Sequence, residues 1–169
     1  MSYPAQRYFG HSGEVTASFR PRSAEPDYVT TPVAKDGPAV ERGTSYHYLA
    51  TMKSTEGDFG LYRVDMAAGA GGPAMHFHKT MSESFFVLDG TLRLHDGSRW
   101  LDGEPGDFLY VPPGGLHAFR NESGEPVSML MLFAPGAPRE GYFEGIAEIA
   151  NLTDDERARF FIEHDSYFT

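Results

Sequence analysis

The sequence predicts an all-β barrel or jelly roll, and three features lead to that fold class. The apolar segments are short, Gly, Pro and Asp separate them, and glycine and proline are frequent, with 19 and 12 residues. This combination is typical of many tight turns that join short strands. A chain of 169 residues is long enough for one well-buried core and too short for two, so we expect one domain with one active centre.

The domain divides into three segments. Residues 1–43 contain spaced prolines and no helical periodicity, which favours an N-terminal arm with one short strand. Residues 44–136 are interpreted as the barrel. Residues 137–169 are interpreted as a helical segment that packs on the outside of the barrel.

Eight strands are expected in the barrel, because runs rich in Val, Leu, Tyr and Phe alternate with turn signals. Their ranges are 46–51, 60–66, 74–78, 84–88, 91–95, 108–111, 118–121 and 127–133. The turn signals fall at residues 89–90, 96–98, 102–103 and 121–124. In the C-terminal segment, Thr153 and Glu156 have the spacing of a capping box and predict a helix over 154–164, after a short helix within 141–150.

Composition excludes several classes of partner and site. The net charge of −10 argues against a nucleic acid or an anionic membrane as a partner. The absence of cysteine excludes disulfides and thiolate metal sites. No apolar stretch has the length of a membrane span, and residues 1–7 lack the apolar run of a secretory signal, so we expect a soluble cytoplasmic protein.

Histidines and a glutamate form a candidate metal site. Alternate residues of a strand point the same way, so His76 and His78 can share one cation while Phe77 faces away. A loop over 79–82 then returns the chain, so that Glu83 can add a carboxylate oxygen.

His117 is the fourth expected ligand, because the Pro-Pro-Gly-Gly turn at 112–115 fixes the backbone before its strand. Imidazole and carboxylate suit one divalent transition metal, Fe, Ni, Co, Mn, Cu or Zn, and four ligands around an octahedral ion leave two positions open. The other histidines, at 11, 47, 95 and 164, are expected at the surface.

These residues match a two-part signature. The first part contains His76, Phe77, His78, Glu83 and Gly90, and the second contains Gly106, Pro112, Gly114, His117 and Asn121. The first part normally begins with glycine, where this chain has Ala70 between Gly69 and Gly71. Over residues 69–133 the chain resembles the cupin superfamily, and within it the small single-domain bacterial cupins similar to quercetinase.

The resemblance implies a double-stranded β-helix with a metal inside the barrel, and a homodimer in which the arm could cross to the neighbouring subunit. It also implies a dioxygenase that acts on a flavonol-like or other enolisable aromatic substrate with O₂. Cupins with the same ligands include cyclases, isomerases and proteins without known activity, so the fold does not determine the reaction. Asn121, Pro112 and Gly114 are assigned structural roles in turns.

Two aromatic residues are candidate substrate-binding residues. Strand parity places Phe85 on the face of Glu83 and Phe119 on the face of His117, where their rings could stack on a flat substrate. The alternative is that both belong to the ordinary barrel core. Residues Met75, Met129 and Met131 could add further walls.

Glu83 is the candidate catalytic residue. In a dioxygenase it would take the proton of the substrate hydroxyl once its contact with the metal loosens. In the alternative reaction, a cyclase or isomerase, it would shuttle a proton without oxygen. The third possibility is a cupin that binds a small ligand and performs no chemistry.

Overall fold

The computed structural model describes residues 17, 19–20, 25–30 and 43–169. His11 and most of the expected arm lie outside these residues. The strands are β1 (Tyr28–Thr30), β2 (Thr44–Ala50), β3 (Gly60–Met66), β4 (His76–Phe77), β5 (Ser82–Asp89), β6 (Leu92–His95), β7 (Trp100–Gly103), β8 (Phe108–Val111), β9 (Ala118–Arg120), β10 (Val127–Ala134) and β11 (Tyr167–Phe168). The helices are α1 (Arg139–Gly145), the 3₁₀ helix η1 (Ile146–Asn151) and α2 (Asp154–Glu163).

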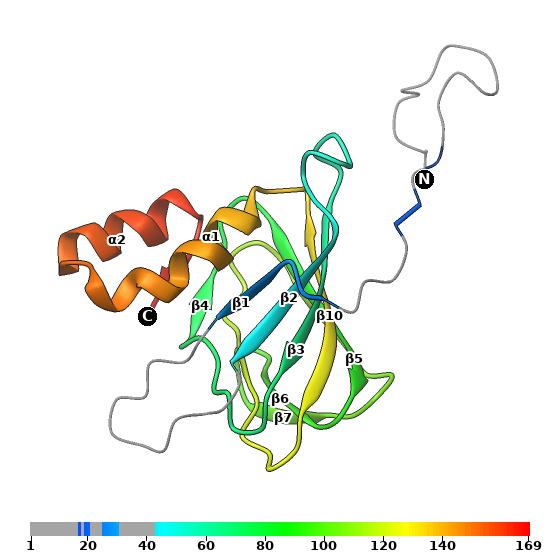
Figure 1. Ribbon diagram of the computed structural model, residues 1–169. Coiled ribbons are helices and arrows are strands. Elements are labelled where there is room, and N and C mark those ends of the chain that lie inside the picture. Colours follow the sequence, from blue (N-terminus) through cyan, green and yellow to red (C-terminus); the bar gives the residue numbers. More distant parts are fainter. Residues whose placement is uncertain (1–16, 18, 21–24, 31–42) are drawn as a thin grey trace.

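The strands form the predicted barrel (Figure 1). Six strands make the largest sheet in the order β1-β2-β3-β10-β5-β8, three make a sheet in the order β7-β6-β9, and β4 pairs with β11. All of these pairings are antiparallel. Isolated bridges pair Gly71 with Asn121 and His76 with His117. The chain before β4 therefore runs antiparallel to β9 and the residues that flank it.

The core lies inside the barrel and consists mainly of inward-facing strand residues. In β3 every second residue is buried, a cleaner alternation than the residue types suggested, because Tyr62 turns inward with Val64 and Met66. The same alternation in β10 buries Met129, Met131 and Phe133. Strand residues on these inner faces therefore form the wall in which the site is built.

The residues of the two-part signature that lie in turns have structural roles. Gly90 has φ +76°, and a side chain there would meet the Pro126 carbonyl oxygen at 2.4 Å. The fully buried Asn121 donates to the carbonyl oxygens of Ala67 and Glu125 and accepts from Ser123. Both residues hold loops that frame the barrel.

Two sequence-based expectations were wrong. The turn expected at residues 102–103 is the end of β7, which pairs with β6. Gly103 is packed closely there, since a β-carbon would lie 2.9 Å from Leu94 Cδ1. His47 is buried rather than at the surface, because Arg63 and Asp65 on the neighbouring strand β3 surround its Nε2 atom at 2.8 and 3.1 Å.

The C-terminal segment lies along one side of the barrel, beside β1 and β4 (Figure 1). The expected capping box is present: the Thr153 hydroxyl accepts from the Glu156 amide, and the Glu156 side chain accepts from the Thr153 amide. The short helix begins at Arg139, two residues earlier than expected, and changes to 3₁₀ geometry at Ile146. None of the helices in the described part of the chain is long and apolar enough to cross a membrane.

Candidate metal centre and cavity

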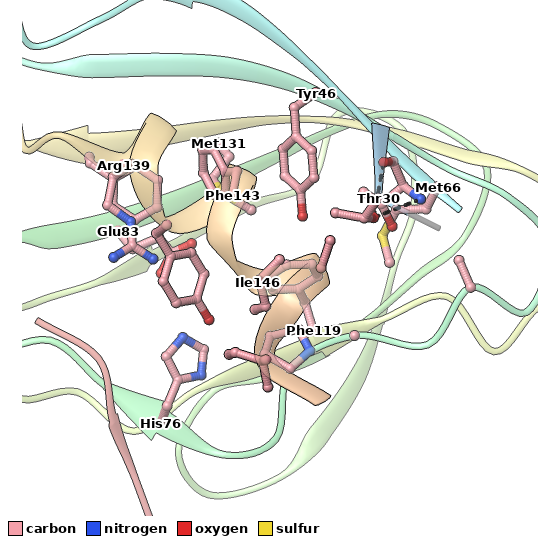
Figure 2. Close-up of a pocket in the computed structure, with 18 of the residues that line it drawn as sticks. Thr30, Tyr46, Met66, His76, Glu83, Phe119, Met131, Arg139, Phe143 and Ile146 are labelled. Atoms are coloured by element: carbon pink, nitrogen blue, oxygen red, sulfur yellow. Dashed lines mark hydrogen bonds between the residues drawn. The ribbon is translucent and has the colours of Figure 1, made fainter. Parts of the chain in front are cut away.

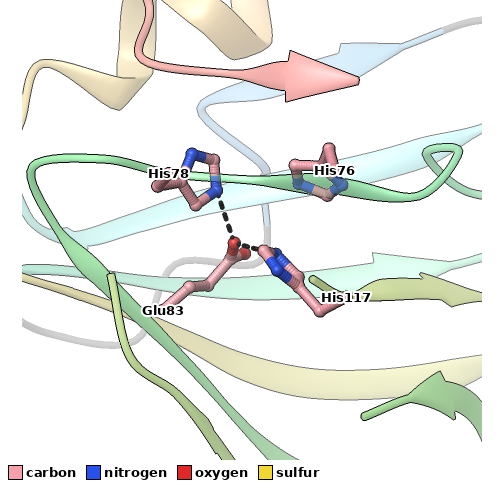
Figure 3. Close-up of side chains that lie close together, drawn as sticks. All are labelled: His76, His78, Glu83 and His117. Carbon is pink, nitrogen blue, oxygen red and sulfur yellow. Dashed lines mark hydrogen bonds and ion pairs between the residues drawn. The ribbon is translucent and has the colours of Figure 1, made fainter. Parts of the chain in front are cut away.

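Four buried side chains converge inside the barrel (Figure 3). His76, His78, Glu83 and His117 each offer one ligand atom, and these atoms lie within 4.8 Å of one another. The Glu83 Oε2 atom is 2.9 Å from His78 Nε2 and 2.8 Å from His117 Nε2. The structure therefore brings together all four residues that the sequence singled out, and we refer to them as the four-residue cluster.

Backbone hydrogen bonds hold the cluster in place. The amide groups and carbonyl oxygens of His76 and His117 pair with each other at 3.0 and 2.9 Å, which places the first histidine strand against the start of β9. The Gly114 amide donates to the His78 carbonyl oxygen, and Gly114 has φ +81°, a conformation that glycine adopts without strain. The turn before His117 thus fixes the position of His78 as well.

The protonation pattern of the three rings fits a metal. Each Nδ1 atom faces a backbone carbonyl oxygen: His76 that of Ala74, His78 that of Asp165, and His117 that of Gly115, at 2.9, 2.6 and 3.0 Å. A carbonyl oxygen only accepts, so Nδ1 carries a proton, and a ring that is neutral then offers the lone pair of Nε2 to a metal. The Nε2 atoms of His78 and His117 both lie beside the Glu83 carboxylate, so a metal bound there would contact all three side chains.

Burial and hydrogen bonding shift the pKa values of the cluster. Burial opposes ionisation of Glu83, but hydrogen bonds from His117 and His78 outweigh it and hold the carboxyl pKa well below its usual value. Burial lowers the pKa of His76 to about 4, so this ring is neutral at pH 7. Burial also disfavours the cationic form of His117, yet its hydrogen bond to Glu83 raises its pKa above the ordinary value. His117 is therefore more readily protonated than a free imidazole when no metal is bound.

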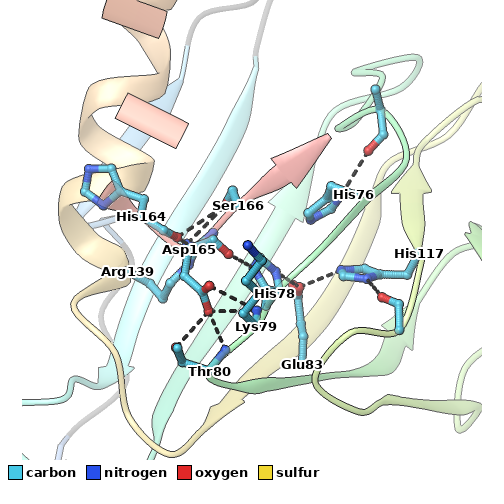
Figure 4. A network of polar contacts seen from close by, with 12 residues as sticks. His76, His78, Lys79, Thr80, Glu83, His117, Arg139, His164, Asp165 and Ser166 are labelled. Atoms are coloured by element: carbon cyan, nitrogen blue, oxygen red, sulfur yellow. Dashed lines mark hydrogen bonds and ion pairs between the residues drawn. The ribbon is translucent and has the colours of Figure 1, made fainter. Parts of the chain in front are cut away.

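The end of the chain supports the cluster from outside (Figure 4). The Asp165 carbonyl oxygen accepts from His78 Nδ1, and its carboxylate accepts from the backbone amides of Lys79 and Thr80. Strand β11 also pairs with β4, and the Phe168 ring stacks on His76 at 5.3 Å between ring centres. Asp165 thus holds the loop that joins two of the ligands. No spacing in the sequence indicates this contact, because the partners lie more than 80 residues apart.

A cavity of about 360 Å³ opens beside the cluster (Figure 2). His76 and Glu83 line it, whereas His78 and His117 do not. Most of the remaining wall is apolar or aromatic and includes Tyr46, Met131 and Phe133. The volume is within the roughly 300–1,000 Å³ of small-molecule sites, so a molecule of two or three rings could meet His76 and Glu83 there.

Helix α1 and helix η1 contribute the other side of the cavity, and we call these two elements the cover. Arg139, Tyr142 and Phe143 come from α1, and Ile146, Ala147, Ile149 and Ala150 come from η1. The Phe143 ring stacks on Tyr46 with 4.4 Å between ring centres, which joins the cover to strand β2. The C-terminal segment therefore does more than pack on the outside of the barrel.

The aromatic residues singled out in the sequence lie at different depths. Phe119 lines the cavity, whereas Phe85 is fully buried behind it, with 5.2 Å between the two ring centres. Among the three methionines, Met131 lines the cavity and Met129 is core. Met75 is partly exposed and is not a lining residue.

Among the charged side chains that line the cavity, Arg139 is the one that sequence reasoning missed. Its side chain is buried, and its guanidinium carbon lies 4.1 Å from the centre of the Tyr142 ring and 4.9 Å from that of Phe133. Burial lowers its pKa, but arginine stays protonated in proteins. A single arginine at the start of a short helix carries no sequence signal of a cavity position.

The chain is similar in sequence to known proteins. A cupin domain matches residues 62–133. Quercetin 2,3-dioxygenase from Bacillus subtilis (strain 168) is 32% identical over 124 residues, an alignment that covers 63% of this chain and 34% of that protein. The chain thus spans about a third of the length of this relative.

Solved structures agree on the fold. KdgF from Halomonas sp. has a TM-score of 0.51 at 19% identity and covers 66% of this chain and 96% of its own. A predicted oxalate decarboxylase from Thermotoga maritima also has a TM-score of 0.51, at 17% identity, and covers 54% of this chain and 80% of its own. These likenesses show the fold alone. The cupin domain match over residues 62–133, together with the relative above, identifies the chain as a member of the cupin superfamily.

Proposed function

We propose that this cupin is a metal-dependent dioxygenase that acts on a flavonol-like or other enolisable aromatic substrate. The observation that carries the proposal is that His76 and Glu83 of the cluster line an aromatic cavity large enough for such a molecule. The 32% identity to a quercetin 2,3-dioxygenase supports the same reaction class. The expected homodimer and cytoplasmic location stay predictions.

The residues of the chain have separate roles in this proposal. His76, His78, Glu83 and His117 would hold one divalent transition metal, which when bound would stabilise an oxyanion and, for a redox-active ion, assist oxygen chemistry. Glu83 takes the proton of the substrate hydroxyl. Phe119 contacts the substrate ring, and Phe85 supports Phe119 from behind. The apolar wall excludes water from the reacting atoms.

Oxygen consumption tests this function. Metal-loaded protein is mixed with flavonols, related phenols and hydroxylated aromatic acids while dissolved oxygen and the substrate spectrum are recorded. We expect oxygen uptake in step with the loss of the flavonol absorption. No uptake and no spectral change with any of these compounds would refute the dioxygenase.

A metal-dependent cyclase or isomerase is the second candidate. The observation that favours it is that the Glu83 carboxylate itself lines the cavity and can move a proton between two substrate atoms without oxygen. Turnover that continues under anaerobic conditions would select this reaction. A ligand that binds tightly and is recovered unchanged from the metal-loaded protein would indicate a binding cupin instead.

A further inference from the structure

Arg139 is a buried cation without a counter-ion in the part of the chain that the structure describes. Its side chain is 3% exposed, and its Nη1 atom donates to the His164 carbonyl oxygen at 2.6 Å and to the Ser166 hydroxyl at 3.4 Å. Among the described residues, nothing accepts a hydrogen bond from Nε or Nη2, and Nε is shielded from solvent. Burial of a charge in this way is costly unless an anion pairs with it.

Two other arginines show what is missing at Arg139. Arg120 and Arg157 also have a buried Nε atom without a hydrogen bond. Each of them has a carboxylate beside it, Glu122 at 3.0 Å from Arg120 and Asp154 at 3.4 Å from Arg157. Within the described residues, Arg139 is the one of these three that forms no ion pair.

The unpaired Nη2 group of Arg139 suits a carboxylate. A guanidinium N–H forms a strong, charge-assisted hydrogen bond to a carboxylate oxygen, whereas Nε is enclosed by protein atoms. The aromatic rings of Tyr142 and Phe133 hold the guanidinium in place but offer no lone pair of that kind. Because Arg139 lines the cavity, its counter-ion can be a ligand bound there.

The net charge of the cavity also favours an anionic ligand. Among the described lining residues, Glu83 is the one acidic side chain, and it belongs to the cluster. With a divalent cation on three neutral imidazoles and Glu83, and with Arg139 nearby, the cavity would carry about two excess positive charges. An apolar enclosure strengthens the preference for an anion, because charges attract more strongly where the surroundings are less polar than water.

We propose that Arg139 binds the carboxylate of the substrate, so that the cavity takes a small aromatic or enolisable acid. This assignment rests on the proposed role of the cavity as the substrate site. The acid group pairs with the Nη2 group of Arg139, and the hydroxyl or carbonyl end of the molecule lies toward His76 and Glu83. Arg139 thereby sets both the substrate class and its orientation.

A matched pair of fluorescent probes tests the assignment without turnover. The probes are 6-hydroxy-2-naphthoate and 6-hydroxy-2-naphthamide, which have nearly the same shape and differ in charge. Their binding is measured by fluorescence titration near neutral pH, with metal-free and with metal-loaded protein. We expect the acid to bind at least about 10-fold more tightly than the amide, since hydrogen bonds to charged groups are the stronger ones.

Two variants assign the preference to one residue. Arg139→Gln is expected to bring the two affinities within about 3-fold of each other, mainly by weakening the acid. Arg157→Gln, which removes an arginine outside the cavity, is expected to leave the preference unchanged. If Arg139→Gln does not fold, Arg139→Lys decides: it keeps the charge but loses the planar guanidinium and the position of its Nη2 donor, so the preference for the acid should fall at least threefold.

An equal affinity of the two probes for the wild-type protein would overturn the assignment, and so would an unchanged preference in the Arg139 variant. The outcome is separable from the oxygen test. If the protein prefers the acid but consumes no oxygen, the dioxygenase proposal is refuted and the role of Arg139 stands. If it oxidises flavonols but shows no preference for the acid, the dioxygenase proposal stands and the role of Arg139 is refuted.

Discussion

The strands that carry the cluster and the cover of the cavity differ in how firmly they are packed. All four cluster residues are buried and held by backbone hydrogen bonds. In the cover, α1 buries Arg139, Tyr142 and Phe143, whereas η1 has no buried residue. Both regions line the same cavity. The difference suggests a division of labour in which the strands set the metal geometry and the cover sets which molecule enters.

The segment that ends the chain connects these two regions. Asp165 follows the last residues of α2 and bonds to the loop between His78 and Glu83, and Ser166 accepts from Arg139 in the cover. Asp165 has φ +51°, a left-handed conformation common just after a helix. This segment therefore forms hydrogen bonds both to the loop beside the cluster and to the cover.

The largest expected effect comes from removing the charge of Glu83, which lies on the strands and not on the cover. Glu83→Gln keeps the shape of the side chain and removes its charge, so we expect turnover to fall by about 10²–10⁴-fold, the range for losing a general base. The three histidines should keep at least part of the metal. Rates and metal content are measured on the same sample, and full activity would show that Glu83 is not the base.

The strands and the cover should also differ in how much a single side chain contributes to the free energy of unfolding. Phe85→Ala empties a fully buried site and should lower the free energy of unfolding by about 3–5 kcal/mol. Ile146→Ala in the cover removes a half-buried side chain and should cost less than about 2 kcal/mol. Urea unfolding measures both. If Ile146→Ala costs as much as Phe85→Ala, the cover is as firmly packed as the strands.

The connection between the regions gives a smaller effect. Asp165→Asn weakens the hydrogen bonds to the Lys79 and Thr80 amides, so metal affinity should fall by about 10-fold, as for other partners of metal ligands. Asp154→Asn, on the exposed side of α2, serves as the matched control with unchanged affinity. Competition with a chelator measures both variants. Equal affinities would mean that the cluster does not depend on the end of the chain.

The smallest expected effect is the release of a proton from His117 when a metal binds. The pKa of His117 is raised by Glu83, so the ring is partly protonated near neutral pH and must lose that proton to bind a metal. We expect up to about one proton released per metal near pH 7, with less release as the pH rises above the pKa of His117. Calorimetry in buffers of different ionisation enthalpy counts the protons. Release that grows with rising pH would contradict this role of His117.

The strand side of the site could be predicted from the sequence, and the cover could not. His76, His78, Glu83 and His117 follow from strand parity and turn chemistry, which are local rules. The roles of Arg139 and Asp165 depend on how a C-terminal segment docks on strands far away in the chain. Trp100–Gly103 was missed for a related reason, because pairing with β6 outweighs the local Asp-Gly turn signal.

The metal content of the purified protein tests the central claim most directly. Elemental analysis is made of the wild-type protein, His76→Ala and His117→Ala, each purified without added metal or chelator, with folding checked by circular dichroism. We expect about one divalent transition metal per wild-type chain and almost none in either folded variant. A wild-type protein without metal, or unchanged metal content in both variants, would contradict the four-ligand site.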